Sequence, residues 1–315
     1  MKFIKHNIIA IALFSCTVGI AQQLPQFTQY MYNTISINPA YAGSREALSI
    51  VGLHRSQWVG FKGGPITQTL SIHTPLRNDR VGVGLSFIED DLGPENFTYL
   101  YGDFSYSIPT GRTGKLAFGI KGGFTQYSFD SEFLNDTDIS NDDYFKGFQN
   151  RWSPNIGLGI YWSTNRIYAG LSTPRVLNTD RNKNNVNPIT NRDYEALEKL
   201  SYYFTLGGVI DLSNNVKFKP AGLVKATNGA PVSFDLTANF LFNEKFWLGG
   251  SYRINEQSAA IGGIADFQVS RQLRVGYAYE KPISEIARYT TGTHEILMIY
   301  EFKFLSSKLK SPRYF

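Results

Sequence analysis

The sequence predicts an all-β protein, a transmembrane outer-membrane β-barrel of about 14 antiparallel strands. Three observations lead to this fold class. Apolar and polar residues alternate with a period of two along most of the chain, and helical periodicity is nearly absent. Most expected strands have about 10–13 residues, which suits a tilted membrane-crossing strand better than an ordinary globular strand. Short and long connections also alternate along the chain.

Residues 1–21 have the three parts of a secretory signal peptide. Lys2 and Lys5 give a positively charged start, residues 8–20 are apolar, and Ala21 ends a small-residue cleavage site. Export of the mature chain is therefore expected.

Cys16 is the only cysteine, and it lies within the predicted signal peptide. Cleavage after Ala21 leaves a mature chain without thiols, which excludes disulfides, thiolate catalysis and Cys-based metal sites. A lipoprotein anchored through Cys16 is disfavoured, because Phe14 is too bulky for its position in a lipidation site.

The composition suits strands that face lipid on one side and a polar lumen on the other. Aromatic residues make up 15% of the chain and 29 of the 315 residues are glycine, yet the mean hydropathy is slightly negative. Apolar-out, polar-in strands give this combination. No stretch after the signal peptide has the ~20 unbroken apolar residues of a membrane helix. The formal charge is +5, and +3 without Lys2 and Lys5, which is too small to indicate nucleic-acid binding.

The alternation is clearest in residues 232–242, where apolar side chains form one face and Ser233, Asp235 and Thr237 lie on the other. The last strand has a similar pattern and ends on the aromatic residue Phe304, as outer-membrane barrels do. Along the whole chain, strands are predicted near residues 45–60, 65–75, 79–90, 96–108, 115–128, 152–163, 166–173, 201–212, 215–226, 231–242, 245–254, 258–269, 271–281 and 293–304.

The connections between these strands test the strand count. If both chain ends are periplasmic, the odd-numbered connections face outward, and these include every long one, near residues 129–151, 174–200 and 282–292. The even-numbered connections are all short. Short periplasmic turns and long external loops are typical of outer-membrane barrels, so this parity favours a barrel over a soluble sandwich.

The predicted organisation has four parts. They are a signal peptide at 1–21, an N-terminal periplasmic plug-like segment at 22–44, the barrel at 45–304 and a basic periplasmic tail at 305–315. The tail residues that could bind a partner are Lys308, Lys310, Arg313 and Phe315.

The N-terminal segment contains a stiff turn. Asn38-Pro39 disfavours both helix continuation and strand pairing, and Gly43 can adopt a positive φ. This turn is expected to fold residues 22–37 toward the barrel mouth. The side chains expected to contact the barrel there are Phe27, Tyr30, Met31, Tyr32 and Tyr41.

No catalytic, cofactor-binding or metal-binding residue is expected. His54, His73 and His294 lack acidic neighbours at ligand spacing, no GxSxG-like context is present, and the acidic stretch 129–151 lacks EF-hand spacing. The charged side chains expected to face inward carry both signs. Their charges would cancel across a partly plugged lumen, which is favoured over a selective anion pore. This inward-facing set is Lys115, Lys121, Lys217, Lys219, Lys225, Asp235, Arg253, Arg274, Glu280, Glu301 and Lys303.

The stretch LPQFTQYMYNTISINPAYAG, followed by RSQWVGFKGGPITQTLSIHTPL, resembles the start of the PorP/SprF family of type IX secretion outer-membrane proteins. The terminal PRYF is also similar to the tail of some members. The residues that carry the resemblance are Pro25, Gln26, Phe27, Gln29, Tyr30, Met31, Asn38, Pro39, Ala40, Tyr41, Ala42, Gly43, Arg55, Gln57, Trp58, Gly64 and Pro65.

The resemblance implies a non-enzymatic outer-membrane component of the type IX secretion system. Such proteins support export or surface attachment of particular cargo, including large adhesins used in gliding motility. They also connect to periplasmic peptidoglycan-associated or secretion-motor lipoproteins. The resemblance carries over no catalytic residue and no cofactor.

Two other classes of barrel protein are also compatible with the sequence. A transport barrel of the long-chain fatty-acid type also has fourteen strands and an N-terminal hatch with an Asn-Pro-Ala sequence, as at residues 38–40. After cleavage, however, only about 16 residues precede Asn38, which is short for a full hatch. A general porin needs an inward-folding constriction loop, for which residues 129–151 or 174–200 could serve.

Overall fold

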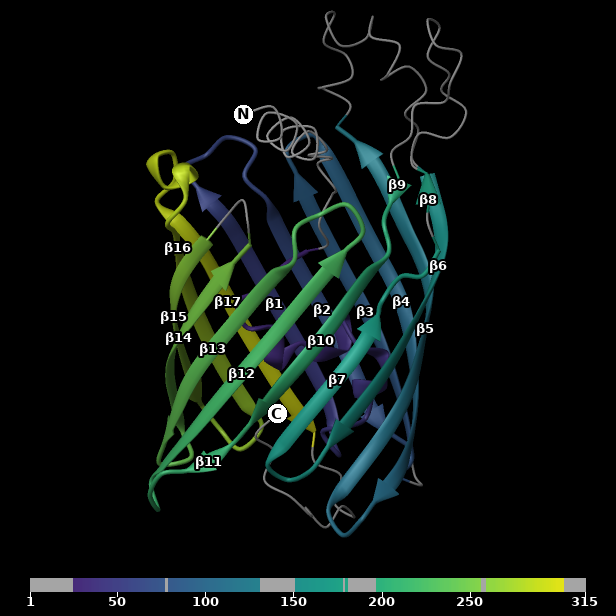
Figure 1. Ribbon diagram of the computed structural model, residues 1–315, viewed down its shortest axis with the longest axis vertical. Coiled ribbons are helices and arrows are strands. Elements are labelled where there is room, and N and C mark those ends of the chain that lie inside the picture. Colours follow the sequence, from purple (N-terminus) through teal and green to yellow (C-terminus); the bar gives the residue numbers. More distant parts are fainter. Residues whose placement is uncertain are drawn as a thin grey trace, which may run out of the picture.

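The computed structural model describes residues 25–76, 79–130, 151–177, 179–180, 197–255 and 259–302. These residues form a closed antiparallel β-barrel of tilted strands (Figure 1). Three short 3-10 helices precede the first strand, and all their residues are buried. They are η1 (Tyr30–Tyr32), η2 (Thr34–Ser36) and η3 (Pro39–Tyr41).

The strands follow one another along the chain in a simple up-and-down order. They are β1 (Leu48–Val59), β2 (Ile66–Pro75), β3 (Val81–Leu92), β4 (Glu95–Thr110), β5 (Gly114–Phe129), β6 (Arg151–Ser163), β7 (Ile167–Thr173), β8 (Thr179–Asp180), β9 (Leu197–Glu198), β10 (Ser201–Gly208), β11 (Ile210–Asp211), β12 (Val216–Thr227), β13 (Ser233–Phe242), β14 (Phe246–Ile254), β15 (Ala259–Gln268), β16 (Leu273–Pro282) and β17 (Gly292–Phe302). A short 3-10 helix, η4 (Glu285–Arg288), lies between β16 and β17.

The barrel has 14 strands, as the sequence predicts. Of the short segments, β8 and β9 pair only with each other, and β11 continues the line of β10 after one residue, Val209. The first and last strands pair in continuous register from Leu48 opposite Phe302 to Ser56 opposite His294. Because β10 pairs with both β7 and β12, the sheet closes on itself.

The connections divide between the two ends of the barrel as predicted. The short-turn end carries the connections at residues 76–80, 111–113, 164–166, 209–215, 243–245 and 269–272. The long-loop end carries those at residues 60–65, 93–94, 130–150, 174–200, 228–232, 255–258 and 283–291. We use these two names below.

The wall is apolar outside and polar inside, as the alternation predicts. In β13 the side chains of Phe234, Leu236 and Phe240 are exposed, whereas Asp235 and Asn239 are buried. Exposed apolar side chains continue on the other strands and form the surface that faces lipid. Among the described residues no helix is long and apolar enough to span a membrane.

Strand limits differ from the predictions in a few places. The predicted strand 201–212 is interrupted at Val209, whose backbone N–H donates to Arg166 O (2.7 Å). The pairing of β10 with β7 ends where Ile167 lies opposite Gly208. Beyond this point the chain pairs with β12 alone, through β11. The predicted end of the last strand at Phe304 and the tail at 305–315 lie outside the described residues.

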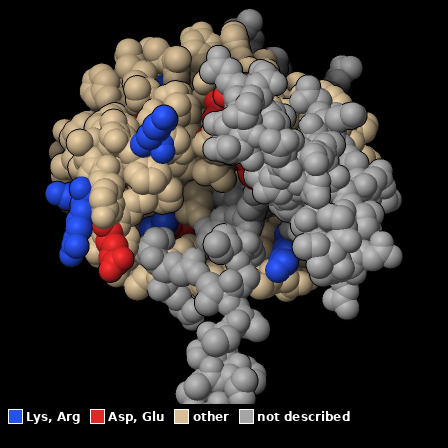
Figure 2. All heavy atoms as spheres, turned by 90° about the horizontal axis from the view of Figure 1, so that it is seen from above, with Lys and Arg blue, Asp and Glu red and all other residues tan. Residues whose placement is uncertain are grey.

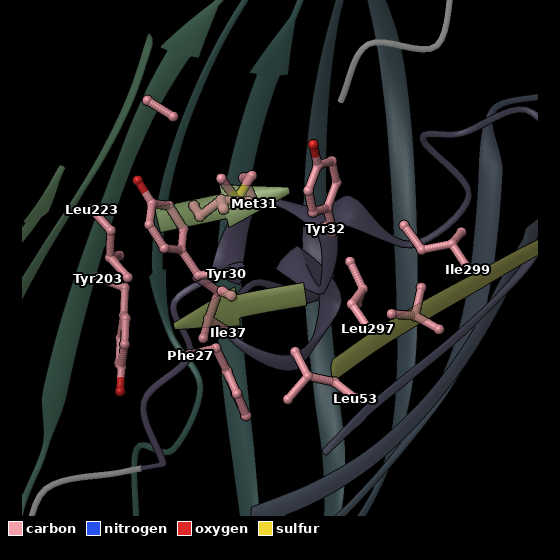
Figure 3. Close-up of a cluster of buried hydrophobic side chains, with 14 residues drawn as sticks. Phe27, Tyr30, Met31, Tyr32, Ile37, Leu53, Tyr203, Leu223, Leu297 and Ile299 are labelled. Atoms are coloured by element: carbon pink, nitrogen blue, oxygen red, sulfur yellow. The ribbon is translucent and has the colours of Figure 1, made fainter. Parts of the chain in front are cut away.

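The main hydrophobic core lies in the lumen. Side chains of the N-terminal segment, Phe27, Tyr30 and Met31 among them, pack there with inward-facing residues of the wall such as Leu223 and Leu297 (Figure 3). All these side chains are nearly inaccessible to solvent. The segment therefore contributes to the core of the barrel.

Candidate functional site

The N-terminal segment, residues 25–46, crosses the whole lumen. Near its start, Arg253 at the long-loop end of β14 donates from Nη2 to Phe27 O (3.1 Å). Near its end, Lys115 at the short-turn end of β5 pairs with Glu46 (Nζ to Oε1, 2.8 Å). The chain thus runs from the long-loop end to the short-turn end before it turns back into β1.

The Asn-Pro motif forms the third helical turn inside the barrel. The Asn38 side chain accepts from Ala40 N (3.0 Å) and so caps η3, and Pro39 takes the first helical position. The Asn38 Nδ2 also donates to Ile160 O (3.0 Å), which ties the turn to β6. The motif therefore folds and anchors the segment.

Gly43 makes the sharp turn out of the lumen. Its φ is +74°, and a Cβ there would lie 2.8 Å from Gly82 Cα, so both the backbone conformation and the close approach require glycine. Its N–H donates to His73 Nδ1 (3.1 Å). His73 is thus a structural acceptor.

A carboxylate of the last strand holds the start of the segment. Glu295 accepts from the backbone N–H groups of Thr28 and Gln29, both at 2.8 Å. Arg55 donates to the same carboxylate (Nη1 to Oε2, 3.0 Å) and to Thr28 Oγ1 (2.6 Å). Because both oxygens of Glu295 bind the segment backbone, Thr28–Gln29 is fixed to β17.

Glu295 belongs to a buried row of alternating charges, which we call the charge row. Arg55 also pairs with Glu280 (2.8 Å), and Glu280 pairs in turn with Arg253 (3.0 Å). Arg253 bonds to Asp235, which also pairs with Lys225 (3.1 Å). The charge row is Glu295, Arg55, Glu280, Arg253, Asp235 and Lys225. Each charge has an opposite neighbour, which is the arrangement that makes buried charges tolerable.

Further polar contacts hold the middle of the segment against β2 and β5. Asn33 forms two side-chain bonds with β2, and Lys121 Nζ donates to two backbone carbonyls of the segment. The partners are Thr69 (2.9 Å) and Ser71 (2.9 Å) for Asn33, and Ile35 O (3.1 Å) and Ser36 O (3.2 Å) for Lys121. The segment is therefore bonded to several strands around the barrel.

Tyr32 lies among cationic and aromatic side chains in the lumen. Lys219 Nζ is 4.7 Å and the Arg274 guanidinium 5.3 Å from the centre of its ring, distances typical of cation–π contacts. Tyr32 therefore fixes this part of the segment to strands on the β12 and β16 side of the wall.

We expect Gly119→Ala in β5 to destabilise the folded barrel by about 1–3 kcal/mol through overpacking. A Cβ at Gly119 would lie 2.1 Å from Ala40 N, a backbone atom of η3 that cannot rotate away. The control is Gly122→Ala on the same strand, where no described atom lies within 4 Å of the added Cβ. Urea midpoints in lipid vesicles measure the difference, and equal midpoints would contradict the tight contact.

A cavity of about 650 Å³ lies above the segment at the long-loop end. The start of the segment, Pro25 and Gln26, and three members of the charge row, Arg55, Arg253 and Glu280, line its lower part. Its sides come from the ends of several strands and from η4. The side-wall residues used below are Gln57, Trp58, Thr67, Asp90, Glu285 and Ile286. Seen from this end, the barrel mouth is hollowed, with charged side chains inside it (Figure 2). We call this space the outer cavity.

A β-bulge turns two consecutive side chains into the outer cavity. The register of β1 against β17 shifts between Ser56 and Val59, and Trp58 has a φ of +55°. Regular strands point successive side chains to opposite faces, but here Gln57 and Trp58 both line the cavity. A left-handed conformation costs about 1–3 kcal/mol at a residue other than glycine. The strained backbone of Trp58 thus marks the point where β1 leaves its regular alternation.

This strain predicts that Trp58→Gly is more stable than Trp58→Ala by about 1 kcal/mol, since only glycine adopts this φ without cost. At the neighbouring strand position, Val59→Gly should instead be less stable than Val59→Ala. Urea midpoints of the four variants give the comparison. If the Gly variant were the more stable at both positions, or the Ala variant at both, the strained bulge would be contradicted.

The structure brings the predicted site residues together in two groups. Five line the outer cavity, namely Pro25, Gln26, Arg55, Gln57 and Trp58. The others follow the segment through the lumen, namely Phe27, Tyr30, Asn38, Pro39, Tyr41 and Gly43. Lys308, Lys310, Arg313 and Phe315 lie outside the described residues.

One contributor, Glu295, is absent from the inward-facing set of charges given above, although it lies on the polar face of the last strand with Glu301 and alternates with the outward-facing Ile296. Within the described part of the chain, no group of three or more His, Cys, Asp or Glu could hold a metal ion. The site therefore consists of a threaded segment, a charge row and a cavity.

Comparison with known proteins identifies the family. The family model described as "Type IX secretion system membrane protein PorP/SprF" matches residues 19–300. The chain belongs to the PorP/SprF family. This PorP/SprF protein is thus a membrane protein of the type IX secretion system, and its barrel places it in the outer membrane. The family is one of secretion-system membrane components rather than of enzymes.

Solved structures resemble the PorP/SprF protein in fold alone. Outer membrane protein Omp33 of Acinetobacter baumannii is 10% identical, with a TM-score of 0.47 over 82% of this chain and 98% of that one. The CymD monoaromatic hydrocarbon channel is 11% identical, with a TM-score of 0.49 over 91% and 96%. The KdgM porin is 10% identical, with a TM-score of 0.38 over 81% and 100%. No curated protein matches the sequence.

Proposed function

We propose that this PorP/SprF protein supports export or surface attachment of a specific type IX cargo protein, such as an adhesin, and has no catalytic role. One observation carries the proposal: the lumen is occupied by a segment bonded to strands around the wall, and the outer cavity lies directly above it. A cavity that ends on a fixed segment is suited to holding a partner rather than to passing a solute through the barrel.

The two ends of the barrel offer different surfaces for partners. We assign the long-loop end, with the outer cavity, to the secreted cargo. We assign the short-turn end to a periplasmic peptidoglycan-associated or secretion-motor lipoprotein. The exposed basic side chains of Arg112, Lys245 and Arg271 at the tips of three short turns support contact with an acidic partner there.

Deletion of the gene should remove at least one type IX cargo protein from the cell surface or release it into the medium. The cargo would lose its attachment or its export, while the remaining outer-membrane proteins stay in place. Quantitative surface and medium proteomics of the deletion strain, with the complemented strain as control, measures this. An unchanged surface proteome would rule out a role in cargo handling.

The transport alternative makes a different prediction. A fatty-acid transport barrel or a porin would leave the surface proteome intact in the deletion strain, and uptake of labelled fatty acid or of small polar solutes would fall. The filled lumen argues against both.

A further inference from the structure

We infer that the outer cavity binds a cationic side chain, an arginine or a lysine, which the secreted cargo protein inserts at the long-loop end. The inference rests on the proposed function, because it assigns a chemistry to the site already given to the cargo. It follows from two carboxylates that line the cavity, Asp90 and Glu285, and from the aromatic ring of Trp58 beside them.

The charge row leaves these two carboxylates without a cation. It contains three carboxylates and three cations, and every member pairs within the row. Arg55 and Arg253, the two cations of the row that line the cavity, both bind Glu280. Within the described part of the chain neither Asp90 nor Glu285 forms an ion pair. The lining of the cavity therefore carries an excess of negative charge.

Asp90 is the more informative of the two carboxylates, because it is buried. It is 9% exposed, and its Oδ1 accepts from Thr67 Oγ1 (2.6 Å), opposite it on β2. One hydroxyl donor does not compensate a carboxylate, and burial of a charge without a counter-ion is unfavourable. A charged group that is kept in a cavity at a cost to stability is typical of a binding site. Asp90 is therefore placed to receive a cation from a partner.

The other walls of the cavity suit a long side chain that ends in a cation. Trp58 is partly exposed and lines the cavity, so a guanidinium or ammonium group there can contact its ring as well as the carboxylates. Apolar residues such as Pro282 and Ile286 also line the cavity and can cover the methylene groups of the side chain. The volume of about 650 Å³ is within the range of ordinary ligand pockets and leaves room for part of the cargo backbone.

A pentapeptide with a single arginine tests the chemistry directly. Gly-Gly-Arg-Gly-Gly with blocked ends is titrated by calorimetry into the purified full-length protein in lipid nanodiscs. Its citrulline counterpart, which has the same shape without the charge, is the matched probe. We expect the affinity to fall by about tenfold or more with the citrulline peptide, and likewise for the arginine peptide in Asp90→Asn or Glu285→Gln.

The control for these variants is Glu89→Gln. Glu89 is the neighbour of Asp90 on β3, and its side chain is exposed on the outer face of the wall. Its replacement removes a carboxylate close to the cavity without changing the lining, so the arginine peptide should bind as it does to the intact protein. Equal affinities for the two peptides, or for Asp90→Asn and the intact protein, would overturn the inference.

Stability separates a binding role of Asp90 from a structural one. Asparagine keeps an oxygen that can accept from Thr67 Oγ1, and it removes the buried charge. Asp90→Asn should therefore unfold in urea at the same concentration as the intact protein or at a higher one. A lower midpoint together with unchanged peptide binding would make Asp90 a structural residue and would remove it from the site.

Cells that carry Asp90→Asn/Glu285→Gln separate this inference from the proposed function. The cargo that the deletion strain loses should also be lost from the surface of these cells, and cells with Glu89→Gln should retain it. If the deletion strain loses cargo while the double variant, present at a normal level in the outer membrane, retains it, the cation site is wrong and the proposed function stands. If the deletion strain retains all its cargo, the proposed function fails and this inference fails with it.

Discussion

Arg55→Met will destabilise the folded barrel by about 3–5 kcal/mol, because removal of one partner leaves buried charges uncompensated. Arg55 is 1% exposed and pairs with both Glu280 and Glu295. Without it, Glu295 still accepts from the backbone of Thr28 and Gln29 but has no paired cation, and Thr28 Oγ1 loses its donor. Urea unfolding of the protein in lipid vesicles, followed by gel mobility, gives the change in midpoint.

His54→Met is the matched control for this variant. His54 is the neighbouring residue on β1, and its side chain is exposed on the outer face. Its replacement should shift the midpoint by less than about 1 kcal/mol, as is usual for surface changes. The double variant Arg55→Met/Glu295→Gln should recover part of the stability, because it removes the carboxylate left without a cation, whereas Glu280 keeps its pair with Arg253. Equal midpoints for Arg55→Met and His54→Met would show that the charge row does not stabilise the fold.

Removal of residues 25–41 will turn a barrel with little conductance into one that conducts ions strongly. Tyr30, Met31 and Tyr32 fill the lumen in the intact chain, whereas the wall behind them is lined by polar groups such as Lys219 and Asn239. A barrel of this size without its filling can hold an aqueous channel. Single-channel recordings in planar bilayers measure the effect, and we expect an increase of an order of magnitude or more.

A second variant keeps this prediction testable if the deletion does not fold. Tyr30→Ala, Met31→Ala and Tyr32→Ala, combined in the full-length chain, should also raise conductance, since all three side chains pack in the lumen. Heat-modifiable migration on a semi-native gel confirms that each variant is folded. If the deletion variant folds but conducts no more than the intact protein, the side chains of the wall close the lumen without the segment.

The strands and their order could be predicted from the sequence because each depends on local alternation. The pattern around Asp235 in β13 is enough to place one face toward lipid and one toward the lumen. Alternation does not fix where a strand stops, however. The break at Val209 depends on where the neighbouring strand β7 ends, and that is a tertiary property.

The residues of the candidate site could be predicted from the sequence, but their arrangement in space could not. The motif residues from Pro25 to Trp58 were found through the family resemblance, but their shared cavity depends on a bulge at Trp58. That bulge has no sequence signal, since the left-handed residue is a tryptophan rather than a glycine. The bond between Arg55 and Glu295 joins residues 240 positions apart, which no local pattern can pair.

The path of the segment constrains the order in which the barrel is built. A chain that runs through a closed ring of hydrogen bonds must either be drawn through the finished ring or be in place before the ring closes. Here β17 makes both contacts: its backbone completes the wall against β1, and its Glu295 fastens Thr28 and Gln29. The final strand to be synthesised therefore seals the seam and secures the first part of the chain in a single step. Barrel closure and lumen filling are thereby coupled through one strand, β17.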